Sequence, residues 1–65
     1  MFEVHRLNEA GMAKAEQISA TFSEALRQLE TVCTAGRELA IVRTKLEEAC
    51  FFAKRAMALD PSNQA

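Results

Sequence analysis

Residues 34–39, Thr-Ala-Gly-Arg-Glu-Leu, place a glycine and an arginine where one helix is expected to end and another to begin. Thr34 is a suitable N-cap, which puts Ala35, Gly36 and Arg37 in the first turn of the second helix. Backbone N–H groups there lack intrahelical partners and lie at the positive end of the helix dipole. Because glycine admits close approach and guanidinium matches phosphate geometry, the pattern is typical of an anion site. The alternative is an ordinary capped turn with a solvated arginine.

Two more residues of the second predicted helix suit the same chemistry. Thr44 follows Arg37 by seven residues and therefore shares its face, where the hydroxyl could contact a ligand or a neighbouring helix. Alternatively, that hydroxyl bonds to the carbonyl four residues earlier. Lys45 could bind a phosphate, or it could extend its charge into solvent from an apolar stem.

The first residues of the chain offer a second set of candidates. Phe2 and His5 could stack on a nucleobase, and Lys14 could neutralise a phosphate. The alternatives are a hydrophobic cap on the fold for Phe2 and a solvated surface position for His5 and Lys14. Asn8 is a candidate ligand contact and also a good N-cap, and the two roles are compatible.

Residues that would support catalysis are missing from the sequence. It contains one histidine and one aspartate, Asp60, which lies near the chain end. Glu47 and Glu48 are neighbours and lie about 100° apart around a helix, so they do not converge. The sequence therefore predicts no enzymatic site, and we expect no cofactor.

The two cysteines, Cys33 and Cys50, have no zinc-ligand spacing with the histidine. In a hairpin they would lie roughly 20 Å apart, whereas a disulfide needs Cα atoms within about 7 Å. We expect both thiols to be buried small hydrophobes in a reducing cytosol.

Composition places the chain among small helical domains. It has 65 residues, of which 49% are hydrophobic and 26% charged, and a net charge of −1. This charge argues against binding to a DNA or RNA polymer. No apolar run has transmembrane length, so no membrane partner is expected.

The apolar spacing predicts one domain, residues 1–65, made of a lead-in (1–8), a helix (9–33), a second helix (35–59) and a polar tail (60–65). Gly11 suggests an irregular first turn or a close approach by another segment. Glu24 and Arg27 form a predicted i,i+3 pair on the outer face. The first helix carries its apolar residues three and four apart: Ile18, Phe22, Ala25, Leu26, Leu29 and Val32.

The second predicted helix carries more apolar surface than one partner helix can cover. One stripe comprises Leu39, Val42, Leu46, Ala49, Ala53 and Ala56, and a second set comprises Ile41, Phe51, Phe52 and Met57. The surplus indicates a subunit interface. The predicted fold is therefore all-α: an antiparallel helical hairpin with a short N-terminal lead-in, assembling into a multimer.

Residues 36–58, GRELAIVRTKLEEACFFAKRAMA, resemble the helical-hairpin domain of the phage anti-CBASS and anti-Thoeris sponge proteins. The resemblance lies in Arg37-Glu38, in the run Thr-Lys-Leu-Glu-Glu-Ala at 44–49, and in the aromatic pair at 51–52. Residues 5–14, HRLNEAGMAK, are similar to the lead-in of compact members.

The resemblance implies a multimer, often a hexamer, that sequesters cyclic oligonucleotide or cyclic ADP-ribose-type signals intact in the cytoplasm of the infected bacterial host. It also supports Gly36, Arg37 and Lys45 as ligand-binding residues. The rival hypothesis is a small helical protein–protein interaction module or phage regulator, which would bind its partner through Ile41, Phe51, Phe52 and Met57.

Overall fold

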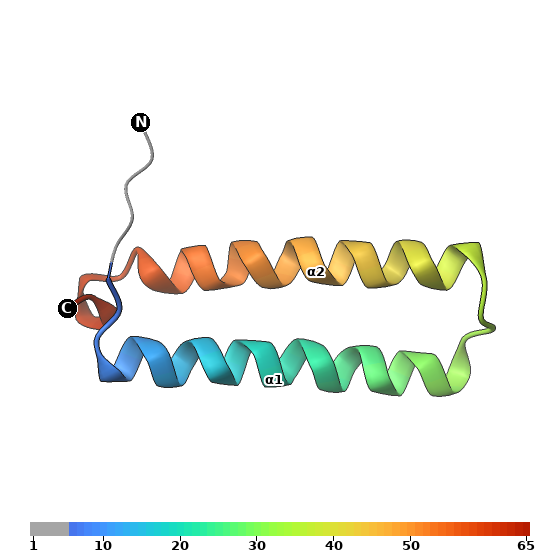
Figure 1. Ribbon diagram of the computed structural model, residues 1–65, viewed down its shortest axis with the longest axis horizontal. Helices are drawn as coiled ribbons and strands as arrows, with labels where there is room; N and C mark the ends of the chain where they lie inside the picture. Colours follow the sequence, from blue (N-terminus) through green and yellow to red (C-terminus); the bar gives the residue numbers. More distant parts are fainter. Residues whose placement is uncertain (1–5) are drawn as a thin grey trace.

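The computed structural model describes residues 6–65 and shows two long antiparallel helices joined by a short loop (Figure 1). Helix α1 spans Glu9–Val32, helix α2 spans Arg37–Ala58, and a 3-10 turn, η1, spans Pro61–Asn63. Within residues 6–65 the only strand-like pairing is an isolated antiparallel bridge between Leu7 and Gln64. The predicted all-α hairpin is confirmed. None of the helices described is long and apolar enough to cross a lipid bilayer.

Helix α1 begins at the cap that the sequence predicts. The Asn8 side chain accepts a hydrogen bond from the Gly11 N–H at 2.8 Å, and Glu9 lies in the first turn, where the dipole favours negative charge. At the other end, Cys33 is the C-cap and donates its N–H to the Leu29 carbonyl at 2.9 Å. Helix α1 therefore ends at Val32, one residue before the predicted boundary.

Helix α2 begins two residues later than the sequence predicts, and Thr34 is not its N-cap. Gly36 occupies that position with φ 153°, a conformation that L side chains rarely adopt. No side chain caps this end of the helix. Because Gly36 has this non-helical backbone conformation, the helical geometry of α2 starts only at Arg37.

The residues of α2 that face α1, here called the seam of α2, differ from the predicted stripe. Ala49 and Ala56 are exposed, whereas Cys50 and Met57 are half-buried between the helices. Successive residues of α2 that face α1 lie about 3.6 positions apart on average, which is the helical period. Successive residues of the predicted stripe lie about 3.4 positions apart, so that stripe would drift around the helix. The seam of α2 consists of Leu39, Val42, Leu46, Cys50, Ala53 and Met57.

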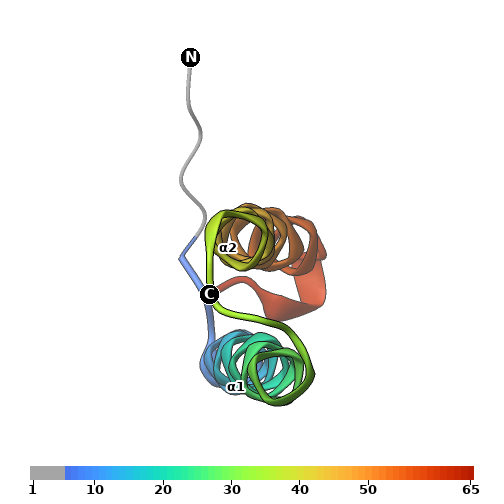
Figure 2. The ribbon, with the colours of Figure 1, turned by 90° about the vertical axis from the view of Figure 1, so that its right-hand side faces the viewer.

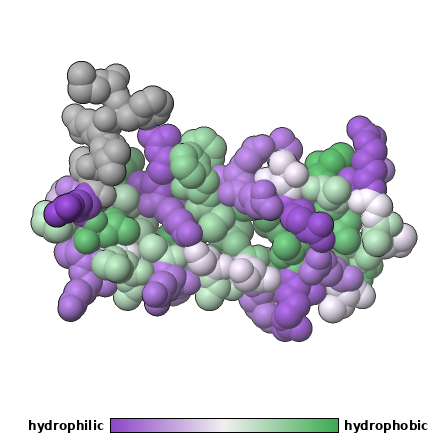
Figure 3. Space-filling model, in the orientation of Figure 1, coloured by the Kyte–Doolittle hydropathy of each residue, from purple (hydrophilic) through white to green (hydrophobic). Residues whose placement is uncertain are grey.

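Most residues along the interface between the two helices are only partly buried. Of the hydrophobic side chains described, Leu39 alone is buried, at 8% exposure. On α1 the predicted residues from Ile18 to Leu29 are half-buried, but Val32 is 80% exposed. Cys33 is exposed too, contrary to prediction, because it lies in the loop. Apolar surface is visible between the helices in Figure 3.

A large apolar surface lies on the outside of α2. Phe51 and Phe52 are 58% and 59% exposed, with ring centroids 5.3 Å apart in an edge-on arrangement. The Arg55 guanidinium lies over both rings, 5.8 and 6.0 Å from their centroids. Ile41 and Leu59 are also exposed. Except for Met57, the residues predicted to be surplus to the hairpin are indeed left uncovered by it.

The last residues fold back against the end of the hairpin, between the start of α1 and the end of α2 (Figures 1 and 2). The Asp60 side chain accepts from the Ser62 N–H at 3.0 Å and caps η1. Asn63 is the buried polar residue of this region, with 2% exposure.

Candidate functional site

Three of the predicted ligand residues line one shallow groove on α2. Arg37, Thr44 and Lys45 lie on one face of the helix with Ala40 and Ile41 between them, and the groove has a volume of about 360 Å³. Its floor is apolar and its ends carry cationic groups. Such a surface suits a ligand with a planar apolar part and several negative charges.

The start of α2 supplies a weaker anion cradle than the sequence predicts. Because Gly36 is the N-cap, the first turn contains Arg37, Glu38 and Leu39. The N–H groups of these residues have no carbonyl partner within the helix. However, Glu38 already places a carboxylate at the positive end of the dipole, and Leu39 is buried. The guanidinium of Arg37 is therefore the principal attraction for an anion here.

The other two polar residues of the groove make only weak internal contacts. The Thr44 hydroxyl donates to the Ala40 carbonyl at 3.1 Å, as its alternative reading predicts. Its oxygen can still accept a hydrogen bond. The Lys45 ammonium lies 3.9 Å from the Glu48 carboxylate and its side chain is 70% exposed, so it remains accessible to a ligand.

The remaining described candidates, Asn8 and Lys14, lie at the opposite end of the hairpin from Arg37 (Figure 1). Asn8 is the N-cap of α1 and also donates to the carbonyls of Ser62 and Gln64, at 2.9 and 3.2 Å. The Lys14 ammonium donates to Asn63 Oδ1 at 2.7 Å. Phe2 and His5 lie outside the described residues. One hairpin therefore does not bring all the candidates into a single pocket.

A second groove, which the sequence analysis did not identify, runs along the seam. It has a volume of about 270 Å³ and combines apolar residues of both helices with hydroxyl and charged groups. The signal in the sequence was the pair Ser19 and Ser23, four residues apart on the seam side of α1. The lining residues are Ser19, Phe22, Ser23, Leu26, Arg43, Leu46, Glu47 and Cys50.

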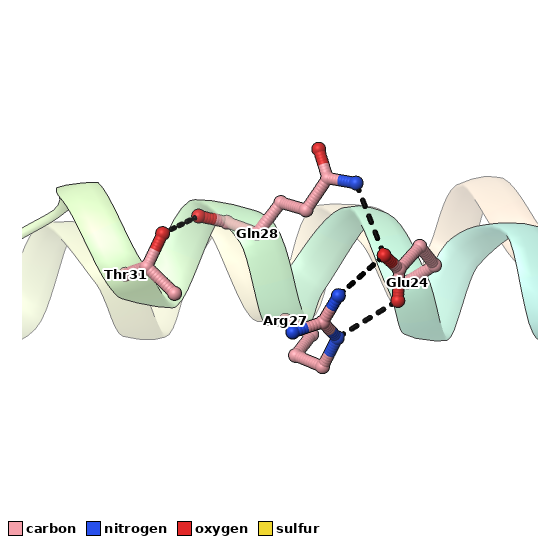
Figure 4. A network of polar contacts seen from close by, with 4 residues as sticks. All are labelled: Glu24, Arg27, Gln28 and Thr31. Carbon is pink, nitrogen blue, oxygen red and sulfur yellow. Dashed lines mark hydrogen bonds and ion pairs between the residues drawn. The ribbon is translucent and has the colours of Figure 1, made fainter.

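The ion pair between Glu24 and Arg27 of α1 lies outside both grooves. Arg27 donates to the Glu24 carboxylate, with Nε at 2.8 Å, and Gln28 donates to it at 3.1 Å (Figure 4). The Arg27 guanidinium, with a smaller contribution from Gln28, lowers the pKa of Glu24. This confirms the predicted pair, which is exposed and leaves both groups fully charged near neutral pH.

Comparison with known proteins identifies one family. The family described as "Acb2/Tad1, hairpin domain" matches residues 2–58, which include all of α1 and α2. No curated protein and no solved structure matches the chain. The match ends where α2 ends, so η1 and the residues after it lie beyond it.

Proposed function

Because this chain belongs to the Acb2/Tad1 hairpin-domain family, the anti-CBASS and anti-Thoeris sponges, we propose that it binds and sequesters cyclic oligonucleotide second messengers without cleaving them. The family implies an anti-defence role based on binding cyclic nucleotides, and its members are binding proteins and not enzymes. The match over residues 2–58 is the observation that carries this proposal. The signal would be removed in the cytoplasm of the infected bacterial host.

The groove on α2 supports this function through its chemistry. Cyclic di- and trinucleotides are rings of two or three sugars joined by phosphates, and each sugar carries a flat base. Arg37 and Lys45 offer cationic groups eight residues apart, about 12 Å along the helix axis. Ile41 and Ala40 lie between them and offer an apolar contact to a base.

The groove also supports assembly, because all its residues come from one helix and leave it open on one side. Pockets for small ligands usually enclose most of the ligand surface. We therefore propose that a second copy supplies the missing wall, in a homo-oligomer that we expect to be a hexamer. The exposed Phe51 and Phe52 offer apolar surface for such contacts.

Thermal unfolding with a panel of cyclic di- and trinucleotides and a cyclic ADP-ribose-type compound tests the proposal. A ligand that binds only the folded state adds about 4 kcal/mol of stability at a thousandfold excess over Kd. Linear dinucleotides of the same base composition are the matched controls. No shift with any cyclic compound would favour the interaction module instead.

Sequestration without cleavage needs a separate measurement. The ligand that gives the largest shift is incubated with the protein, the protein is denatured, and the released nucleotide is identified by mass spectrometry. We expect full recovery of the intact cyclic compound. Recovery of a linear product that grows with time would show that the protein is an enzyme.

A further inference from the structure

The segment formed by residues 60–65, here called the terminal clamp, binds the start of the chain through several backbone contacts. Asn8 donates its N–H to the Asn63 carbonyl at 3.0 Å, and Ala65 donates its N–H to the Arg6 carbonyl at 2.9 Å. The Asn8 side chain adds its bonds to two further carbonyls of the clamp. The clamp therefore fixes the point at which the lead-in joins α1.

The side chains of the clamp attach it to the end of α2. Asn63 donates its side-chain amide to the Met57 carbonyl at 2.9 Å, and Gln64 donates to the Ala58 carbonyl at 2.8 Å. These carbonyls belong to the last turn of α2, where intrahelical donors are lacking. The clamp thus joins both helices at the open end of the hairpin.

Gly11 explains why the clamp can lie so close to α1. Gly11 is buried, and a Cβ atom at this position would overlap the Asn63 carbonyl oxygen and press on the Leu7 side chain. A glycine in the first turns of a helix ordinarily costs stability. Here it makes room for the backbone of the clamp, which confirms the close approach expected from the sequence.

Asn63 holds Lys14 in a way that leaves its charge available. The Asn63 Oδ1 atom is a neutral acceptor, and it engages one of the three donors of the ammonium group. The Asp60 carboxylate accepts a hydrogen bond from the Ser62 N–H, and the Lys14 charge makes a minor contribution to its lowered pKa. The contact with Asn63 therefore occupies one donor of Lys14 without neutralising its charge.

We propose that the terminal clamp is a positioning element of the ligand site, in which Asn63 holds the Lys14 ammonium and the Asn8 backbone in place. This inference rests on the proposed function and on the sequence-based prediction that Asn8 and Lys14 contact the ligand. The clamp lies outside residues 2–58, which the family match covers.

The test opens the clamp without changing any candidate ligand residue. Gly11→Ala places a methyl group against the Asn63 carbonyl, and Asn63→Ala removes the bonds to Lys14 and Met57. Ala13→Gly, at an exposed position of α1, measures the ordinary helix preference for alanine over glycine. By that preference alone Gly11→Ala would raise Tm, whereas the clamp contact predicts that it lowers Tm.

Two local measurements report the clamp directly and need no ligand. In both opened variants the Asn8 amide should exchange with solvent about tenfold faster, as expected for the loss of one hydrogen bond. The Cys33 amide at the loop end should be unchanged. Pulse acetylation of Lys14, measured relative to Lys45 in the same sample, should increase. A higher Tm for Gly11→Ala with unchanged Asn8 exchange and Lys14 labelling would overturn the clamp.

Isothermal titration with the best cyclic nucleotide of the panel then tests positioning. Gly11→Ala should weaken binding several-fold, whereas Ala13→Gly should not. Equal affinities of parent and Gly11→Ala, with the clamp shown to be open, would overturn the positioning role. If the parent binds none of the nucleotides, the proposed function is wrong. The contacts of the clamp are still tested in that case, because hydrogen exchange of Asn8 and acetylation of Lys14 need no ligand.

Discussion

The Arg43 guanidinium of α2 donates a hydrogen bond to the Glu30 carboxylate of α1 at 2.7 Å. Among the described residues this is the one ion pair that joins the two long helices. The two partners lie thirteen positions apart in the sequence, on either side of the loop. The pair therefore helps to set how the helices align beside the seam groove, which Arg43 also lines.

Removing this pair should have only a small effect on stability. The two side chains are 48% and 41% exposed, so solvent screens their attraction. Arg43→Met should lower the free energy of unfolding by less than about 1 kcal/mol, and by less still in 1 M salt. Arg27→Met, which breaks a pair within α1, is the matched control. Urea unfolding at two salt concentrations measures both, and a loss independent of salt would contradict an electrostatic origin.

Acid should weaken the terminal clamp through Asp60. Hydrogen bonds from Ser62 lower the pKa of Asp60 in the folded protein, with a minor contribution from the Lys14 charge. The folded state therefore binds fewer protons than the unfolded state. The stabilisation is present above the ordinary pKa of Asp and is lost as pH falls through the lowered value, below about 4.

The Ser62 amide resonance should report this titration, and Asp60→Asn should abolish it. The Gln28 side-chain amide, which follows the lowered pKa of Glu24 on α1, is the internal reference and should titrate in both proteins. A Ser62 midpoint at or above the ordinary pKa of Asp would contradict the assignment.

Gly36 should be required for the turn and not only for ligand access. A Cβ atom there would meet nothing within 4 Å, yet φ is 153°, so the cost of a side chain is conformational. Gly36→Ala should destabilise the hairpin by about 1–3 kcal/mol. Thr34→Ala is the control: it should cost less than about 0.5 kcal/mol, since Thr34 is not the N-cap. Chemical unfolding of both variants decides, and the reverse order of costs would restore Thr34 as the cap.

Local rules predicted α1 well and α2 less well, for physical reasons. The cap at Asn8 and the pair of Glu24 with Arg27 depend on neighbours a few residues away, and both are confirmed. On α2, Ala49 and Cys50 are both small, so composition did not show which of them faces α1. Only the exact helical period, continued from Leu39, selects Cys50.

Local sequence rules did not predict the contacts between residues that lie far apart in the sequence. Asn63 reads as part of a polar tail, and its burial depends on the chain returning to Gly11 and Lys14. For the candidate site, the sequence predicted only which residues share one face of a helix. Helical spacing placed Arg37 and Thr44 together, but residues that other copies would contribute cannot be located from one hairpin.

Phe52→Glu should break the proposed assembly while leaving the hairpin folded. Phe52 is 59% exposed in the single chain, so the change removes little from its own seam. In an interface it would place an unpaired charge in an apolar contact, which is strongly unfavourable. Ala20→Glu, at an exposed position of α1, controls for the added charge. Sedimentation should give a monomer for Phe52→Glu alone, and an unchanged oligomer would exclude this face.

Arg37→Ala is the decisive change for the ligand site. Arg37 lies at the start of α2, where its charge opposes the helix dipole, so alanine should not lower stability or helix content. Loss of a charged hydrogen-bond partner should weaken ligand binding about ten- to a hundredfold, and more where several copies face one pocket. Arg37→Lys should recover only part of the affinity, since an ammonium keeps the charge and loses the planar fork. Arg27→Ala, on the outer face of α1, should leave binding unchanged and serves as the control in the same titration. An affinity for Arg37→Ala equal to that of the parent would make residues 34–39 a plain turn and would move the proposed site to Phe2, His5 and Lys14.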